Sequence, residues 1–207
     1  MLIIQKFPSG PLGTNAILFG CSSTGKGAVI DPSQGSTNPI LQEAHILGLT
    51  IEMILLTHSH WDHIADVHEL RERTDVPVYI HPLDEGNLVD PGSDGLPLYF
   101  PIRGVEADRF LDESKVIQLG DLTIQVIHTP GHSPGCVCFY LKDQKVLFSG
   151  DTLFKGAMGG LHLPTAKPEL MWDSLDKLAA LPSDVRVIPG HGEDTTIGKE
   201  TWLKNRR

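Results

Sequence analysis

Residues 54–70 join an apolar run to a dense set of metal-ligand side chains. The apolar run ends at Thr57, and within the next six positions come four potential ligands: His58, His60, Asp62 and His63. In an extended segment residues two apart project to the same side, so the first two histidines can bind one ion. After a turn, the aspartate and the third histidine can face a second ion beside it. The spacing therefore predicts a metal-binding loop directly after a buried strand.

Three more ligand-type residues each follow a predicted strand and lie among glycines or prolines: His132, Asp151 and His191. Small residues there allow the backbone to come close to bound ions. Seven ligands are enough for two adjacent ions if one carboxylate bridges them. We expect His58, His60 and His132 at the first ion, and Asp62, His63 and His191 at the second. Asp151 would contact both ions, and the open coordination positions indicate a catalytic site.

The donor chemistry limits the metals that such a site would take. Neutral imidazole and carboxylate suit zinc, iron or manganese, and no cysteine lies near the motif to form a structural thiolate site. We expect two divalent ions per chain, zinc first, with iron or manganese as alternatives. The role of Asp31 is open from sequence, because it either supports the ligand loop or forms a turn before Pro32.

Length and charge give the broad class of the protein. A chain of 207 residues suits one domain, residues 1–207. The formal net charge of −9 argues against nucleic acid as a partner. Three cysteines without a regular spacing favour reduced thiols and a cytoplasmic location. We find no export leader and no apolar run long enough for a membrane span.

Hydrophobic periodicity predicts alternating strands and helices. Strands are expected at 2–7, 15–20, 27–30, 51–56, 76–80, 116–119, 122–127, 136–141, 145–148 and 185–188, and helices at 37–47, 63–73 and 169–181. Residues 86–113 show no periodicity and many glycines and prolines. Such a segment is either a lid or binding loop over a site or an ordinary surface excursion.

The ligand pattern resembles the metallo-β-lactamase superfamily, whose H-x-H-x-D-H motif, later His, later Asp and final His match here in order. Segments 131–135, 150–154 and 189–198 are similar to the short single-domain members of its glyoxalase II branch. The resemblance implies an α/β fold, an αββα sandwich of two mixed β-sheets flanked by helices, with the metals at one edge. It also implies a hydroxide held by two metals that hydrolyses a small thioester, hydroxyacylglutathione, with Asp62 as a catalytic residue.

Substrate contacts are expected in the segment that follows Asp151. Members of this branch usually carry Lys or Arg, which helps to hold the substrate, where this chain has Gly160. Gly160 cannot make that contact. Lys155 lies nearby in sequence and either replaces it or is a solvated lysine. The candidate substrate-binding positions are Lys155, Gly160 and His162.

Thioester hydrolysis suits this residue set because a thiolate, from a thiol of pKa about 8.5, leaves without a proton. An amide or β-lactam nitrogen is a much poorer leaving group and would need a general acid. A persulfide dioxygenase with a single iron on His58, His132 and Asp151 is the alternative enzyme. Other ester or lactone hydrolases and a non-catalytic metal-binding module are further alternatives, and the oligomeric state stays open.

Overall fold

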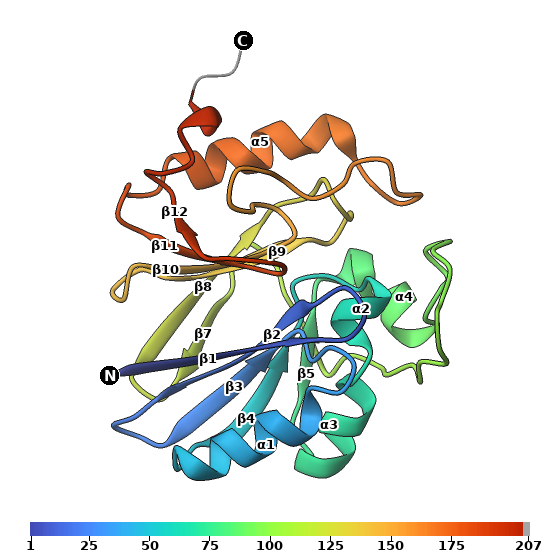
Figure 1. Cartoon of the computed structure of the whole chain (residues 1–207), viewed down its shortest axis with the longest axis vertical. Helices are drawn as coiled ribbons and strands as arrows, with labels where there is room; N and C mark the ends of the chain where they lie inside the picture. Colours follow the sequence, from blue (N-terminus) through green and yellow to red (C-terminus); the bar gives the residue numbers. More distant parts are fainter. Residues whose placement is uncertain (205–207) are drawn as a thin grey trace.

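The computed structural model describes residues 1–204 and contains two six-stranded β-sheets packed face to face (Figure 1). The first sheet has strands in sequence order: β1 (Leu2–Ser9), β2 (Thr14–Cys21), β3 (Lys26–Ile30), β4 (Thr50–Leu55), β5 (Val78–Ile80) and β6 (Arg109–Phe110). The second sheet runs in the reverse order, from β12 (Thr195–Thr196) through β11 (Arg186–Pro189), β10 (Val146–Gly150), β9 (Val137–Leu141) and β8 (Leu122–His128) to β7 (Val116–Leu119). Both sheets are mixed, because β3 to β6 pair in parallel and β10 pairs in parallel with β11.

The main core lies between the two sheets. Strand β2 is buried along its whole length, and its side chains alternate between two cores. Ile17 and Phe19 pack between the sheets, where the rings of Phe19 and Phe148 lie 5.1 Å apart. Ala16 and Leu18 point to the other side, against the helices. A period of two with both faces apolar is what a strand in the middle of a layered fold requires.

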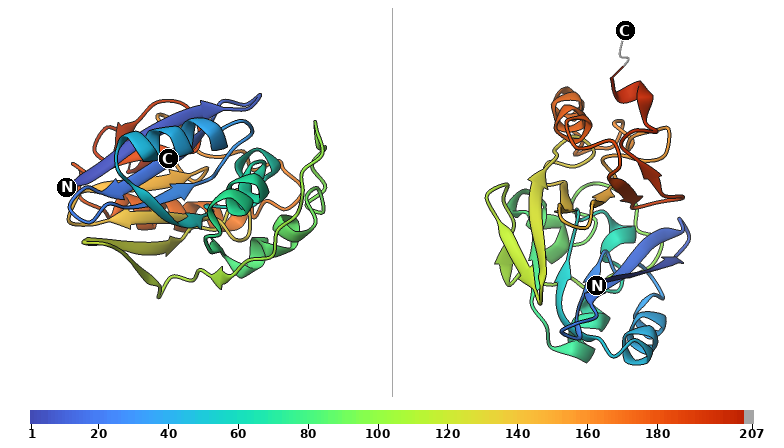
Figure 2. Two further views of the ribbon diagram at one scale, coloured as in Figure 1. Left: turned by 90° about the horizontal axis from the view of Figure 1, so that it is seen from below. Right: turned by 90° about the vertical axis from the view of Figure 1, so that its left-hand side faces the viewer.

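Helices cover the outer face of each sheet (Figures 1 and 2). The helices are α1 (Thr37–Ile46), α2 (Trp61–Ile64), α3 (Val67–Thr74), α4 (Glu85–Val89) and α5 (Pro168–Ala179), with 3₁₀ turns η1 (Pro82–Asp84) and η2 (Thr201–Leu203). Ile40 of α1 and Leu70 of α3 pack on the first sheet, and Met171 and Leu175 of α5 pack on the second. The predicted αββα sandwich is confirmed.

The predicted helix over 63–73 is wrong, because the chain forms two short helices that meet at Asp66. The backbone N–H of Asp66 donates to Pro32 O, at 2.9 Å. Its carboxylate accepts bonds from the N–H and hydroxyl of Thr37, both at 3.0 Å, in the first turn of α1. Negative charge at a helix N-terminus is favourable. These contacts of Asp66 with Pro32 and α1 interrupt the helix between α2 and α3.

Residues 86–113 are more ordered than predicted, and two strands of the fold, β6 and β12, were missed. Helix α4 occupies the beginning of the segment, and near its end β6 pairs in parallel with β5. Strand β12, outside the segment, pairs with β11. All three elements are short, so their side-chain periodicity is too brief to stand out in sequence.

The described residues contain no helix that combines the length and apolar character of a membrane span. The three cysteines are buried and free.

Candidate metal centre

The seven predicted ligands come together at one edge of the sandwich. His58 and His60 follow β4, and Asp62 and His63 lie on the first turn of α2. The remaining three follow the ends of three strands of the second sheet: His132 after β8, Asp151 after β10 and His191 after β11. Strand ends from both sheets therefore supply the site.

His58, His60 and His132 form the first predicted triad. His60 Nδ1 lies 3.1 Å from His58 Nε2 and 2.9 Å from His132 Nε2. All three side chains are buried, and their three ring nitrogens face one point. Three converging imidazole nitrogens are a donor set that suits a divalent transition metal.

Asp62, His63 and His191 form the second predicted triad. Asp62 Oδ2 lies 3.4 Å from His63 Nε2 and 3.3 Å from His191 Nε2. The two histidine Nε2 atoms are 3.3 Å apart. These atoms also meet closely enough to hold one metal ion.

Asp151 lies between the two triads, as predicted for a shared ligand. Its Oδ2 lies 3.3 Å from His132 Nε2 in the first triad and 3.5 Å from His191 Nε2 in the second. Its Oδ1 is buried and lies 3.4 Å from His63 Nε2, a ligand of the second triad, and it accepts no hydrogen bond within residues 1–204. A buried carboxylate oxygen without a donor is costly unless a cation faces it. The residues present therefore fit two metal ions.

Hydrogen bonds on the far side of the rings fix which nitrogen faces the site. His63 Nδ1 donates to Asp31 Oδ2 at 2.9 Å, and His132 Nδ1 donates to Gly160 O at 2.9 Å. His58 Nδ1 lies 3.0 Å from the Thr57 hydroxyl, which donates to Asp31 Oδ2 at 2.6 Å. Acceptors of this kind leave Nε2 free as the metal-binding atom. Asp31, whose role was open from sequence, supports two ligands at once.

Glycines let these loops approach one another, as the sequence predicted. A Cβ atom added to Gly190 would lie 2.2 Å from Asp151 Oδ1 and 2.8 Å from His63 Cε1. Gly150, at the end of β10, has a φ of +48° and packs against Thr57. Any side chain at Gly190 would displace the shared carboxylate.

The two triads differ in electrostatics. Burial, together with the neighbouring histidines, lowers the pKa of His58 and takes the pKa of His60 to about 3, so both rings stay neutral. Burial also opposes protonation of His191, but hydrogen bonds to Asp151 and Asp62 raise its pKa to about 9. His58 and His60 are thus ready to coordinate. In the second triad, nearby carboxylates also outweigh burial and raise the pKa of His63, so this triad binds protons near neutral pH when no metal is present.

The metal affinity of the second triad should therefore decrease as the pH is lowered below about 9. A metal must displace the protons of His63 and His191, and each proton displaced costs about a tenfold loss of apparent affinity per pH unit. The first triad should show a much flatter dependence. Competition titrations with zinc at several pH values, with proton release measured in parallel, test this. Equal pH slopes for the two sites would contradict it.

Asp84, which sequence reasoning did not identify, connects two ligand loops. Its buried carboxylate accepts bonds from Ser59 N at 3.0 Å, Ser133 Oγ at 2.7 Å and Gly135 N at 2.6 Å. Ser59 lies between two ligands, and Ser133 directly follows a third. No local pattern marks this residue, because its partners lie far along the chain.

Replacing Asp84 with Asn should lower the free energy of unfolding by about 2 kcal/mol, because an amide NH₂ would face donors that a carboxylate accepts. Asp90→Asn, at an exposed position just after α4, is the matched control and should have little effect. Chemical denaturation of both variants measures the difference. If the two variants are equally stable, Asp84 does not hold the loops together.

An open pocket of about 230 Å³ lies over the ligands. Its floor is formed by five predicted ligands: His60, Asp62, His132, Asp151 and His191. The other residues that line it are Leu12, Trp61, Leu96, Pro97, Tyr99 and Leu163. Three of these wall residues belong to the irregular part of segment 86–113, so this part is a wall of the site.

The predicted substrate-contact residues do not line this pocket. Lys155 is exposed and forms an ion pair with Glu193. Gly160 meets the site through its backbone carbonyl, which holds the ring of His132. His162 is exposed, on the same loop. A substrate-binding role for these three residues stays a prediction.

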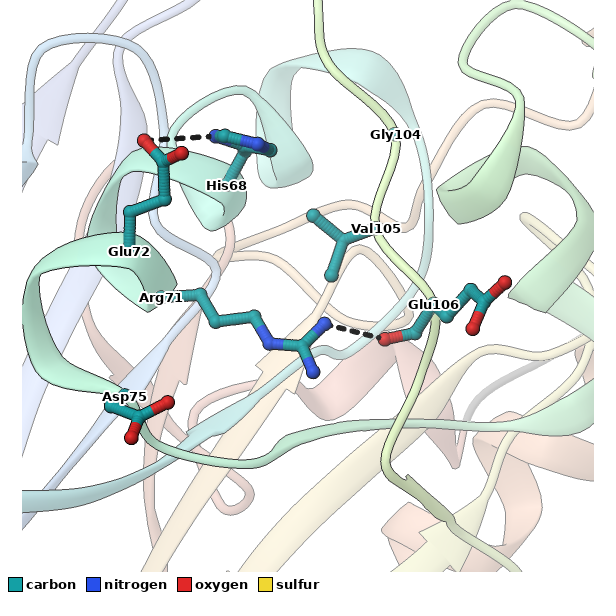
Figure 3. Close-up of a pocket in the computed structure, with 7 residues that line it drawn as sticks. All are labelled: His68, Arg71, Glu72, Asp75, Gly104, Val105 and Glu106. Atoms are coloured by element: carbon teal, nitrogen blue, oxygen red, sulfur yellow. Dashed lines mark hydrogen bonds and ion pairs between the residues drawn. The ribbon is translucent and has the colours of Figure 1, made fainter.

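A larger cavity, of about 520 Å³, lies between α3 and residues 104–106 (Figure 3). The guanidinium of Arg71 contacts Glu106 O and Asp108 in or beside it, and none of the predicted ligands lines it. The guanidinium of Arg71 is thus already paired with protein groups, and the predicted metal ligands lie outside this cavity.

Comparison with known sequences gives two informative relatives. The probable metallo-hydrolase YqgX of Bacillus subtilis (strain 168) is 35% identical over 199 residues, which cover 93% of this chain and 92% of the relative. The hydroxyacylglutathione hydrolase GloC of Haemophilus influenzae is 31% identical over 182 residues, covering 84% of this chain and 83% of GloC.

Two crystal structures show the same architecture. The BLEG-1 B3 metallo-beta-lactamase has a TM-score of 0.90 and 34% identity, with 98% of this chain and 100% of the other covered. TTHA1623 in a di-iron-bound form has a TM-score of 0.83 and 39% identity, with coverage of 95% and 96%. The model of the metallo-beta-lactamase superfamily matches residues 9–191, which include every predicted ligand. This chain therefore belongs to the metallo-β-lactamase superfamily.

Proposed function

We propose that this protein is a metal-dependent hydrolase that cleaves thioesters. The observation that carries the proposal is the meeting of two ligand triads around one shared carboxylate, beneath an open pocket. Two divalent cations bound there would lower the pKa of a bound water from about 15.7 towards 7 and polarise the carbonyl of the substrate. TTHA1623, of similar structure, was crystallised in a di-iron-bound form, which supports a site for two ions.

The residues of the chain hold this site in shape before substrate arrives. Asp31 and the carbonyl of Gly160 orient the rings of His63 and His132, and Thr14 Oγ1 donates to Asp62 Oδ2 at 2.6 Å. Fixed ligands keep the reacting groups in place without reorganisation during the reaction.

The leaving group favours a thioester over an amide. Beyond the predicted ligands, the described residues that line the pocket include no His, Asp, Glu, Lys or Cys, and Tyr99, whose phenol carries an acidic proton, is largely exposed. A thiolate leaves without one, whereas an amide nitrogen needs a general acid. The name of GloC, a hydroxyacylglutathione hydrolase, supports thioester chemistry in this part of the superfamily.

The assay is thiol release by the purified, metal-loaded protein from two thioesters, S-D-lactoylglutathione and S-acetyl-N-acetylcysteamine. We expect kcat/KM of about 10⁴ M⁻¹s⁻¹ or more for the preferred thioester class. Removing the metals with a chelator should abolish turnover, and adding zinc, iron or manganese should restore it, with two ions per chain. One ion per chain, and oxygen uptake with glutathione persulfide in place of thiol release, would instead support the single-iron dioxygenase.

A further inference from the structure

The walls of the pocket over the metal centre consist of aromatic and aliphatic side chains without a charged group. Trp61 lies between two ligands in sequence, and its ring lies 5.2 Å from that of Tyr99 and 5.6 Å from that of Phe100. Leu12 and Leu163 reach the same pocket from two other loops. The apolar surface thus begins directly beside the reacting centre.

The outer part of this surface is exposed to water. The Tyr99 side chain is 73% exposed and that of Leu12 is 55% exposed, whereas Trp61 beneath them is only 5% exposed. When an apolar group covers exposed aromatic and aliphatic side chains at the border of a ligand pocket, the free energy of the complex is lowered. A substrate whose carbonyl reaches the floor would place its neighbouring group against these walls.

The described residues that line the pocket include no Lys or Arg. The two lysines associated with the His191 loop already have partners there, because Lys155 pairs with Glu193 and Lys6 pairs with Asp194 at 2.6 Å. Glutathione carries two carboxylates, which bind most strongly to cationic or multiple hydrogen-bond donors. The walls supply no cation for such contacts.

Hydrogen bonds tie the start of the wall segment, at Leu96, to the ligand loop. Asn87 donates to Ser59 O, between His58 and His60, at 2.5 Å and to Asp94 Oδ2 at 3.1 Å. Asp94 in turn accepts a bond from Leu96 N at 2.9 Å, directly before Pro97. A preformed apolar wall selects substrates by shape at little conformational cost.

From these contacts we infer that the enzyme recognises its thioester by an uncharged, apolar acyl group and not by a charged thiol carrier. The inference rests on the proposed thioester hydrolysis and specifies its substrate class. Thioesters of aromatic or branched aliphatic acids are the expected substrates.

Four thioesters separate the two parts of the substrate: acetyl and phenylacetyl groups, each on N-acetylcysteamine and on glutathione. On the neutral carrier, phenylacetyl should exceed acetyl by about tenfold or more in kcat/KM. A change of carrier to glutathione should alter kcat/KM by less than about fivefold. Equal rates for the two acyl groups, or a gain of tenfold or more from glutathione, would overturn the inference.

Variants in the wall test whether the preference comes from this pocket. Tyr99→Ala and Leu163→Ala should each reduce the ratio of phenylacetyl to acetyl kcat/KM by about fivefold. Phe110→Ala removes another half-exposed aromatic residue, on β6 outside this pocket, and should leave the ratio unchanged. Unchanged ratios in both wall variants would show that the acyl group binds elsewhere.

A binding measurement separates this inference from the proposed function. In a non-hydrolysable analogue, a CH₂ group separates the carbonyl from the sulfur of N-acetylcysteamine. By calorimetry, the phenyl form should bind about tenfold more tightly than the methyl form, to the metal-loaded and metal-free protein alike. If no thioester is cleaved but this difference is found, the proposed function fails and the apolar site stands. If thioesters are cleaved but the two analogues bind equally, the proposed function stands and the inference of an apolar acyl site fails.

Discussion

Replacing Asp151 with Ala is expected to lower kcat/KM by about 10³-fold or more and to reduce the bound metal from two ions to less than one per chain. The reason is the position of the carboxylate between the triads, within 3.5 Å of a histidine nitrogen in each. Removing it deletes a ligand from both predicted ions and leaves each with three. It also removes negative charge beside His63 and His191, which holds those rings in place.

The measurement combines metal analysis after loading, steady-state kinetics and circular dichroism. Asp143→Ala, in the exposed turn between β9 and β10, is the matched control and should keep both metal and activity. Asp151→Asn refines the result, because it preserves the side-chain volume and removes only the charge. A variant with Ala at this position that retained two ions and near-normal turnover would show that Asp151 is not shared between them.

The ligand set could be predicted from sequence because the fold places strand ends together. Each of His132, Asp151 and His191 follows a strand, and the chain turns sharply at glycines or prolines beside each of them. Strand ends at one edge of a layered α/β fold meet regardless of their separation in sequence. The structure brings these side chains together, and each of the two predicted triads lies close enough to hold a metal ion.

The supporting residues could not be predicted in the same way. Asp84 and Asn87 act through contacts to backbone groups of distant loops, and nothing in their local sequence distinguishes them from ordinary polar turn residues. Asp66 breaks the predicted helix for the same reason, since its partners lie on α1 and after β3. Long-range contacts override local propensity wherever a buried carboxylate finds donors on another element.

The wall of the pocket could be predicted from the sequence only in part. Trp61 lies inside the H-x-H-x-D-H motif, so its position beside the metals was visible in the sequence. What the sequence did not show is that Tyr99 and Leu163, from separate loops, meet in the same pocket. The pocket wall is therefore built from loops whose irregular sequence carried no periodic signal.

Asp62→Ala is expected to remove the second ion while the first stays bound, and to lower kcat/KM by about 10² to 10³-fold. Asp62 supplies the carboxylate of the second predicted triad, through Oδ2, and supplies no atom to the first triad. Thr14→Val is the matched variant, because it keeps the ligand and removes only the 2.6 Å hydrogen bond to it. It should cost about tenfold in metal affinity or activity, as expected for a partner that orients a ligand.

Together these two variants discriminate between the enzyme classes. A hydrolase that uses both ions needs Asp62, so metal content and thiol release should fall together in Asp62→Ala and fall less in Thr14→Val. A dioxygenase with one iron on His58, His132 and Asp151 does not need Asp62 as a ligand and should retain its iron and its oxygen uptake in both variants. Unchanged thiol release in Asp62→Ala would contradict the two-metal mechanism, because the second triad would then be dispensable for the reaction.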